Sequence, residues 1–211
     1  RNQGAVENFK VVLNEANAVY FMWAAADDIW SVDWLDAVYA EVQRQTGSVA
    51  IFGDLRQIDE NGNEILTLAT NAKIDFSGSL YKRLIKFFLM HEGRGKANLF
   101  HSLYQIDNLR KVVLTDYPYD YQILYELLRL MRVVQISGPI LFKRVHRESA
   151  GYSQNSEAND SLGKIRLAIK ADLIFSKIYF MENLPFHLRL IQGALIPLKL
   201  LFGLFARIQN F

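Results

Sequence analysis

Two adjacent carboxylates, Asp27 and Asp28, directly follow an apolar and aromatic run over residues 18–25. The run is short, continuous and rich in Val, Tyr, Phe and Trp, which predicts a buried strand. Ligands bind beyond the carboxyl ends of strands in open α/β sheets, and adjacent carboxylates repel each other unless a cation or proton lies between them. Because Mg²⁺ and Mn²⁺ prefer oxygen ligands, the pair indicates a divalent-metal site for a nucleotide diphosphate. The alternative is an ordinary loop in which Asp serves as a turn or cap residue.

The surrounding patterns predict the elements that would position these carboxylates. Apolar periodicity indicates helices and strands in alternation near the start of the chain, and hence an α/β fold with parallel strands. A later hairpin, turning at Asn61-Gly62, makes the expected sheet mixed. Ser31 is expected to cap the second helix. Helices are predicted over 4–16, 32–45, 77–91, 119–131, 161–182 and 185–209, strands over 48–54, 96–106 and 133–146, the hairpin over 56–66, and a polar loop over 147–160.

Composition and charge narrow the functional classes. Half of the 211 residues are hydrophobic, which is ample for a core, and the absence of cysteine excludes disulfides and thiolate metal sites. Residues 1–60 carry ten acidic and four basic side chains, whereas residues 161–211 carry two acidic and seven basic ones. A basic, apolar tail of this kind is typical of contact with a negatively charged membrane surface. No basic stripe with interleaved aromatics is present, so nucleic acid is not an expected partner.

A longer stretch around the two carboxylates has a family resemblance. The sequence RNQGAVENFKVVLNEANAVYFMWAAADDIWSVDWL, residues 1–35, resembles the middle of a family 2 glycosyltransferase of the GT-A fold. In that family an Asn-x-Gly stretch opens a helix that contains a further Asn, and a strand then ends in an Asp-rich metal motif. Residues 49–64 resemble the strand and hairpin that follow the motif, and residues 117–153 resemble the acceptor-side helix, a strand and the Arg/His loop. The resemblance covers residues 1 to about 155.

The resemblance implies a fold and a reaction. We expect a GT-A-like mixed sheet with flanking helices over 1–158 and a C-terminal helical tail over 159–211. The implied enzyme is an inverting glycosyltransferase that moves a sugar from a nucleotide-diphosphate sugar to a saccharide or lipid-linked acceptor in glycan or cell-surface polysaccharide synthesis. The family's opening strand and loop, which grip the nucleotide base, have no counterpart here, so we expect a chain that lacks that N-terminal section.

Site residues follow from the same resemblance. Asp28, with Asp27, would bind Mg²⁺ or Mn²⁺, and Asp120 would remove the proton from the acceptor hydroxyl. Trp30 and His101 would line the acceptor side. The donor would be bound by Asn2, Gly4, Asn8, Asp27, Arg144 and His146, with Lys143 and Arg147 as further cations near the leaving diphosphate.

Ordinary structural roles remain open for each of these residues. Asn2 and Gly4 also suit a turn, and Asp120 suits the N-terminal turn of a helix. The basic loop around Arg144 also suits a solvated strand end, and His101 suits a hydrogen-bonded core position. Trp30 also suits core packing.

Two other classes remain open for the whole chain. One is a metal-dependent nucleotidyltransferase on a similar sheet, and the other is a non-catalytic truncated transferase that acts as a binding module. The tail at 185–209 suits an interfacial helix whose Lys and Arg side chains snorkel, or a helix packed on the domain or in a dimer seam. The expected location is cytoplasmic and peripheral to the inner face of the membrane.

Overall fold

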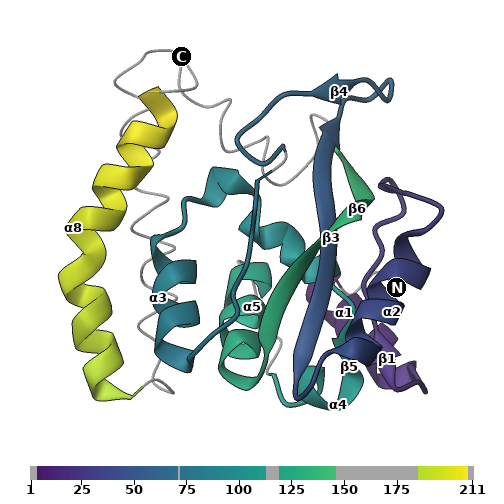
Figure 1. Ribbon diagram of the computed structural model, residues 1–211, viewed down its shortest axis with the longest axis horizontal. Coiled ribbons are helices and arrows are strands. Elements are labelled where there is room, and N and C mark those ends of the chain that lie inside the picture. The colour runs from purple at the N-terminus through teal and green to yellow at the C-terminus, as the bar shows by residue number, and fades with distance from the viewer. Residues whose placement is uncertain (1–3, 71, 113–118, 146–184, 209–211) are drawn as a thin grey trace.

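The computed structural model shows a mixed α/β fold of two sheets and several helices (Figure 1). Asn2 and His146 lie outside the described residues, as do the predicted loop over 147–160, the predicted helix over 161–182 and the expected boundary at 158. The structure describes residues 4–70, 72–112, 119–145 and 185–208.

Two long parallel strands form the spine of the larger sheet. Strand β3 (Val49–Ile58) pairs in parallel with β6 (Arg132–Arg144) along nearly its whole length. A short strand flanks each of them in antiparallel pairing, β2 (Ile29–Trp30) on β6 and β4 (Glu64–Ile65) on β3. The predicted mixed sheet and hairpin are therefore confirmed, and the α/β class with them, but the parallel partner of β3 is β6 and not the run over 18–25.

The segment before the two aspartates differs from its prediction. Strand β1 covers only Tyr20–Phe21 and pairs antiparallel with β5 (Tyr104–Gln105) in a separate two-stranded sheet. The run was expected to be a buried strand over 18–25, but Val19 is exposed, and Trp23 packs in an aromatic cluster beyond the strand. The aspartates consequently do not follow a parallel strand. They lie in the connection that leads into β2, because aromatic packing rather than sheet pairing buries the run.

A bulge interrupts the pairing of the two long strands. Their register shifts between Phe52 and Asp54, at Gly53. A Cβ atom on Gly53 would lie 2.4 Å from the Trp34 ring and 2.3 Å from the carbonyl oxygen of Pro139. Only glycine lets the strand pass this close to the ring.

Helices pack around the sheet and supply much of the core. Their bounds are α1 Ala5–Glu15, α2 Trp34–Arg44, α3 Leu80–Leu89, α4 Ile106–Leu109, α5 Tyr119–Leu130 and α8 Phe186–Ile208, with 3₁₀ helices η1 Glu92–Arg94 and η2 Lys96–His101. The five helices predicted outside residues 161–182 are found as α1, α2, α3, α5 and α8, each somewhat shorter than expected. Helix α5 buries Ile123, Leu124, Leu127 and Leu128 almost completely. Each such side chain contributes about 1.5–3 kcal/mol of transfer free energy.

Two local predictions were wrong. The Ser31 hydroxyl does not cap α2 but accepts a hydrogen bond from the Ile140 amide of β6 at 2.9 Å, and Asp33 precedes the helix. Residues 96–101 form a 3₁₀ helix instead of the start of a strand. The buried Lys96 ammonium donates to the carbonyl oxygens of Phe87 and Met90, at the C-terminal end of α3, which draws this segment under the helix.

Candidate functional site

Asp28 is enclosed and paired at the end of β6. Its side chain is 0% exposed, and its Oδ2 atom lies 3.0 Å from the Lys143 Nζ atom. Its Oδ1 atom accepts a hydrogen bond from the Arg144 backbone amide at 2.9 Å. The pairing arises because β2 runs antiparallel beside β6, which brings the turn before β2 against residues 143 and 144. The carboxylate is therefore neutralised by a neighbouring cation of the same chain.

Arg144 joins two turns that lie far apart in the sequence. Its Nε atom donates to the carbonyl oxygen of Asp27 at 3.0 Å. Its Nη1 atom donates to the carbonyl oxygens of Asp59 and Glu60, at 2.8 and 3.0 Å, in the turn between β3 and β4. A guanidinium held by three carbonyl oxygens acts as a clamp on both turns. Sequence reasoning predicted Arg144 to bind the donor, and this clamping role was not anticipated.

His101 lies in the same region as a buried imidazole. Its Nδ1 atom is 2.8 Å from the carbonyl oxygen of Trp23, and since a carbonyl only accepts, Nδ1 carries the hydrogen. Burial, and then the charge of Lys143, lowers the pKa of His101, while the Trp23 carbonyl and the charges of Asp28 and Asp27 partly offset this. The imidazole is therefore held neutral, with Nε2 left as the acceptor nitrogen.

Trp30 connects His101 to the sheet. The Trp30 ring meets the His101 ring edge to face at a centroid distance of 6.0 Å, and meets Trp34 at 4.7 Å. Trp30 is only half-buried, whereas Trp34 is buried completely against the Gly53 bulge. Trp30 thus rests on a rigid aromatic base and keeps part of its surface accessible.

The 3₁₀ helix η2 links this region to the start of α5. The Lys96 ammonium, at one end of η2, lies 5.7 Å from the centroid of the Tyr121 ring in the first turn of α5. His101, at the other end of η2, contacts Trp30. Asp120 belongs to the same first turn of α5, and its side chain lies outside the part that the structure describes. The 3₁₀ helix η2 therefore lies between Trp30 and the backbone of Asp120, the residue expected to act as the base.

The predicted residues of α1 lie at its exposed start. Gly4 precedes α1 with a φ of 92°, and its carbonyl oxygen accepts from the Asn8 amide at 3.1 Å. Both residues are exposed. The helix is fixed by Phe9, whose ring packs against Trp23 and Phe100, next to His101. Asp27, Asp28, Trp30, His101 and Arg144 thus come together, and α1 is anchored beside them.

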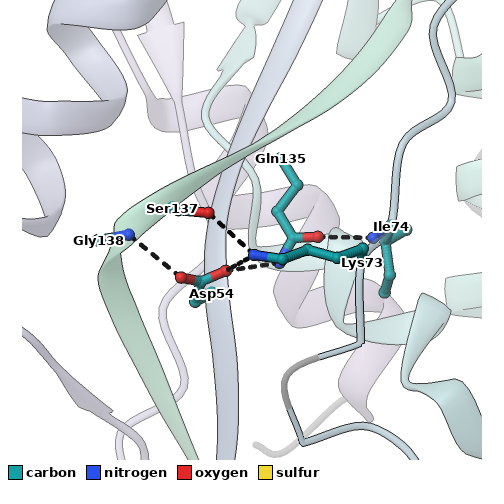
Figure 2. A network of polar contacts seen from close by, with 6 residues as sticks. All are labelled: Asp54, Lys73, Ile74, Gln135, Ser137 and Gly138. Atoms are coloured by element: carbon teal, nitrogen blue, oxygen red, sulfur yellow. Dashed lines mark hydrogen bonds and ion pairs between the residues drawn. The ribbon is translucent and has the colours of Figure 1, made fainter.

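Sequence reasoning missed a second polar network, which joins β3 to β6 (Figure 2). The Asp54 carboxylate accepts hydrogen bonds from the side-chain amide of Gln135 and the backbone amide of Gly138, each at 3.1 Å. The Lys73 Nζ atom lies 3.3 Å from Asp54 and also donates to the Ser137 hydroxyl at 2.9 Å. A signal was present, because Asp54 ends an apolar run just as Asp27 and Asp28 do.

In their observed arrangement, Asp27 and Asp28 do not form a suitable set of ligands for a divalent metal. The Asp28 carboxylate is enclosed and already carries the Lys143 ammonium, which would repel a second cation. Asp27 lies on the exposed side of the turn. Within the described ranges, no three His, Asp or Glu side chains gather in a way that could hold a metal ion. The expectation of Mg²⁺ or Mn²⁺ stays a prediction from the resemblance, and no chemical step is derived through a metal here.

No family model and no curated protein matches the sequence of this chain.

Proposed function

We propose that this chain is part of an inverting glycosyltransferase, which moves a sugar from a nucleotide-diphosphate sugar to a hydroxyl of a saccharide or lipid-linked acceptor. One observation carries the proposal. Residues that the sequence analysis assigns to the metal, the acceptor and the donor, namely Asp28, His101 and Arg144, converge around β2 and the end of β6. They are scattered over more than a hundred positions of the sequence, so their convergence is a property of the fold.

The proposed reaction needs a base on one side of the sugar and positive charge on the other. The acceptor oxygen bonds to the anomeric carbon as the base takes the hydroxyl proton. The bond from that carbon to the diphosphate oxygen breaks, and the nucleoside diphosphate leaves with the electron pair. Asp120 would be the base, by resemblance.

Lys143 is the cation best placed for the leaving diphosphate. Its side chain is 27% exposed, and one of its three N–H donors points to Asp28. The other two would remain for phosphate oxygens. Asp28 would then serve to hold the ammonium in place, because a buried carboxylate restricts the lysine to one position. Trp30, whose ring is partly accessible, would form the wall against which a sugar stacks.

Binding of diphosphates tests this assignment. We expect calorimetric titration of uridine diphosphate, guanosine diphosphate or inorganic pyrophosphate into the 211-residue chain to show binding. Replacement Lys143→Gln should weaken it about tenfold or more, the loss of one charge-assisted hydrogen bond. Lys73→Gln is the matched control, since Lys73 also pairs with an aspartate, Asp54 of β3, away from the Asp28 region.

The outcomes separate the proposal from its alternatives. Absence of binding for all three probes, or equal weakening by both lysine variants, would overturn the role of Lys143. Titrations with Mn²⁺ and with a chelator test the metal expectation, which fails if affinity is the same in both. Release of nucleoside diphosphate from a nucleotide sugar supports sugar transfer, whereas release of pyrophosphate from a nucleoside triphosphate supports nucleotidyl transfer.

A non-catalytic binding module is the second candidate, and a specific observation favours it. Asp28 is enclosed and neutralised, and Arg144 is engaged with three carbonyl oxygens, so both residues already have structural roles. Diphosphate binding without any turnover of a nucleotide sugar would support this candidate over the transferase.

A further inference from the structure

Helix α8 directs its polar side chains toward the rest of the protein. The buried Gln192 amide donates to the Tyr125 hydroxyl of α5. The Lys199 ammonium, 2% exposed, donates to the carbonyl oxygen of Phe88 in α3 at 3.1 Å. These two contacts are about two helical turns apart. They hold α8 lengthwise along α3, at the left edge of the view in Figure 1.

The predicted snorkelling of the basic side chains does not hold for Lys199. Its ammonium points into the protein and satisfies a helix carbonyl, and it does not extend toward solvent. At the start of the helix, the His187 ring nitrogen lies 2.6 Å from the Tyr81 hydroxyl of α3. The packed side of α8 therefore combines the polar Gln192 and Lys199 with the buried Leu188.

The outward side of α8 carries large apolar side chains. We call this surface the outer ridge, and its members are 37–68% exposed. Their spacing of three, four, seven and eight positions places them along one broad side of a helix. The outer ridge consists of Phe186, Leu190, Ile191, Leu198, Leu201 and Phe202. An ordinary surface helix has a polar outward side, whereas α8 carries large apolar side chains on its outward side in addition to the Leu188 that it packs in the core.

The outer ridge offers no hydrogen-bonding side chain. A protein interface of this length would normally include a polar rim and about one hydrogen bond per 100–200 Å². Hydrocarbon requires none, since a lipid-facing helix satisfies its own backbone. By length and composition alone, Phe186–Gly203 is the one stretch of the described residues that meets the requirements for crossing a membrane. Because Gln192 and Lys199 bind it to α5 and α3, it would lie along a membrane rather than across it.

The charge beside the outer ridge is complementary to anionic lipid. Neither α8 nor α3 contains an aspartate or glutamate. Helix α3, which packs against α8, exposes Lys82, and its Lys86 ammonium donates to the carbonyl oxygen of Asp75. Lys and Arg side chains close to an anionic leaflet are attracted to it.

The geometry points to a membrane-docking surface: the outer ridge of α8 lies in the interfacial plane of an anionic phospholipid bilayer, with the exposed Lys82 of α3 on the headgroup side. This position would hold whether or not the chain transfers sugars. It deepens the sequence-based expectation of a peripheral membrane contact by specifying which side of the helix faces lipid.

Vesicle binding tests this surface. The 211-residue chain should float with vesicles of phosphatidylcholine and phosphatidylglycerol, and much less with phosphatidylcholine alone. The double variant Leu190→Glu, Leu201→Glu should reduce the bound fraction at least about tenfold, because two carboxylates would enter the interface. Leu66→Glu is the matched control, since Leu66 is an exposed leucine far from α8 in the fold. Far-UV circular dichroism and thermal melting should show that all variants fold alike.

A second measurement keeps the test decisive if the double variant fails to fold. In the variant Leu201→Trp, brominated lipid should quench the fluorescence of the added indole. In the variant Leu66→Trp, it should not. Two results would overturn the proposal. One is equal quenching in the two tryptophan variants, or equal vesicle binding by Leu190→Glu, Leu201→Glu and by Leu66→Glu. The other is a chain that binds no vesicles and whose mass in solution is that of a dimer which Leu190→Glu, Leu201→Glu dissociates, since the occupant would then be a second copy.

Discussion

Two aspartates, Asp28 in the turn before β2 and Asp54 on β3, are both held by β6 but in different surroundings. Asp28 binds Lys143 and a backbone amide of β6, and Asp54 binds Lys73 and another backbone amide of β6. The Asp28 side chain is 0% exposed and its lysine 27%, whereas Asp54 is 20% exposed and its lysine 70%. The two pairs have similar partners and differ in burial. The buried Asp28–Lys143 pair therefore fixes the residues around it, whereas the more exposed Asp54–Lys73 pair only supports the bulge between β3 and β6.

The largest effect is expected when the buried pair loses its cation. Replacement Lys143→Ala leaves the enclosed Asp28 carboxylate with one backbone amide, which should cost about 3–5 kcal/mol of unfolding free energy. Urea denaturation at neutral pH measures it. Asp28→Ala should cost less, because the partly exposed Lys143 can turn to solvent. A larger loss for Asp28→Ala than for Lys143→Ala would contradict this account of the pair.

The bulge that lies between the two regions gives the next effect. In Gly53→Ala the added methyl group meets the Trp34 ring and the Pro139 carbonyl, and overpacking of this kind costs about 1–3 kcal/mol. Near-ultraviolet circular dichroism should change as well, since Trp34 packs against Trp30. Unchanged stability together with an unchanged spectrum would mean that the strand shifts without strain and that the regions are independent.

Asp54 itself should give an effect of about 1–2 kcal/mol. Replacement Asp54→Asn removes the charge that strengthens the bonds from Lys73, Gln135 and Gly138 but keeps one acceptor oxygen. Chemical denaturation gives the value, and diphosphate binding at the Asp28 region should be unaffected. Loss of that binding would show that the second network also serves the candidate site.

Acidification should affect the Asp28 region through His101. The folded-state pKa of His101 lies below its ordinary value of 6.5, so the unfolded chain binds the extra proton first as the pH falls through that value. This part of the stability is present above pH 6.5 and is lost below it. The variant His101→Gln should show a smaller decline in melting temperature between neutral and mildly acidic pH. An identical decline in both proteins would assign the effect to other groups.

The smallest effect belongs to Lys73. Its ammonium is mostly in water, and exposed ion pairs contribute about 0–1 kcal/mol. We therefore expect Lys73→Ala to change the unfolding free energy by less than about 1 kcal/mol, with added salt removing the difference. If Lys73→Ala were as costly as Lys143→Ala, burial would not distinguish the two pairs.

Much of the fold could be predicted from local patterns. The periodicity of residues 119–131 predicted α5, and the Asn61-Gly62 pair predicted the hairpin, where Gly62 has a φ of 89°. The prediction of a buried strand over 18–25 was wrong, because a stretch of aromatic side chains is equally compatible with a strand and with an aromatic cluster. The 96–101 segment was mistaken for a strand, because the Lys96 contact that bends it under α3 comes from the tertiary structure.

The candidate site was predicted only in part. The chemistry of Asp27 and Asp28 drew attention to the right turn, and Trp30, His101 and Arg144 are close to it. Nothing in the sequence indicated that Lys143 would pair with Asp28, 115 positions earlier in the chain. The Asp54 network was missed for the same reason, since its partners come from β6 and from the segment before α3.

By itself, the sequence determined the α/β class, the positions of most helices and the apolar character of the C-terminal tail, because each depends on periodicity within a few residues. Only the tertiary structure decided which cation neutralises Asp28, which carbonyls Arg144 clamps and which side of α8 faces outward. These depend on how β2, β6 and the helices pack, and packing brings together residues whose spacing along the chain carries no signal.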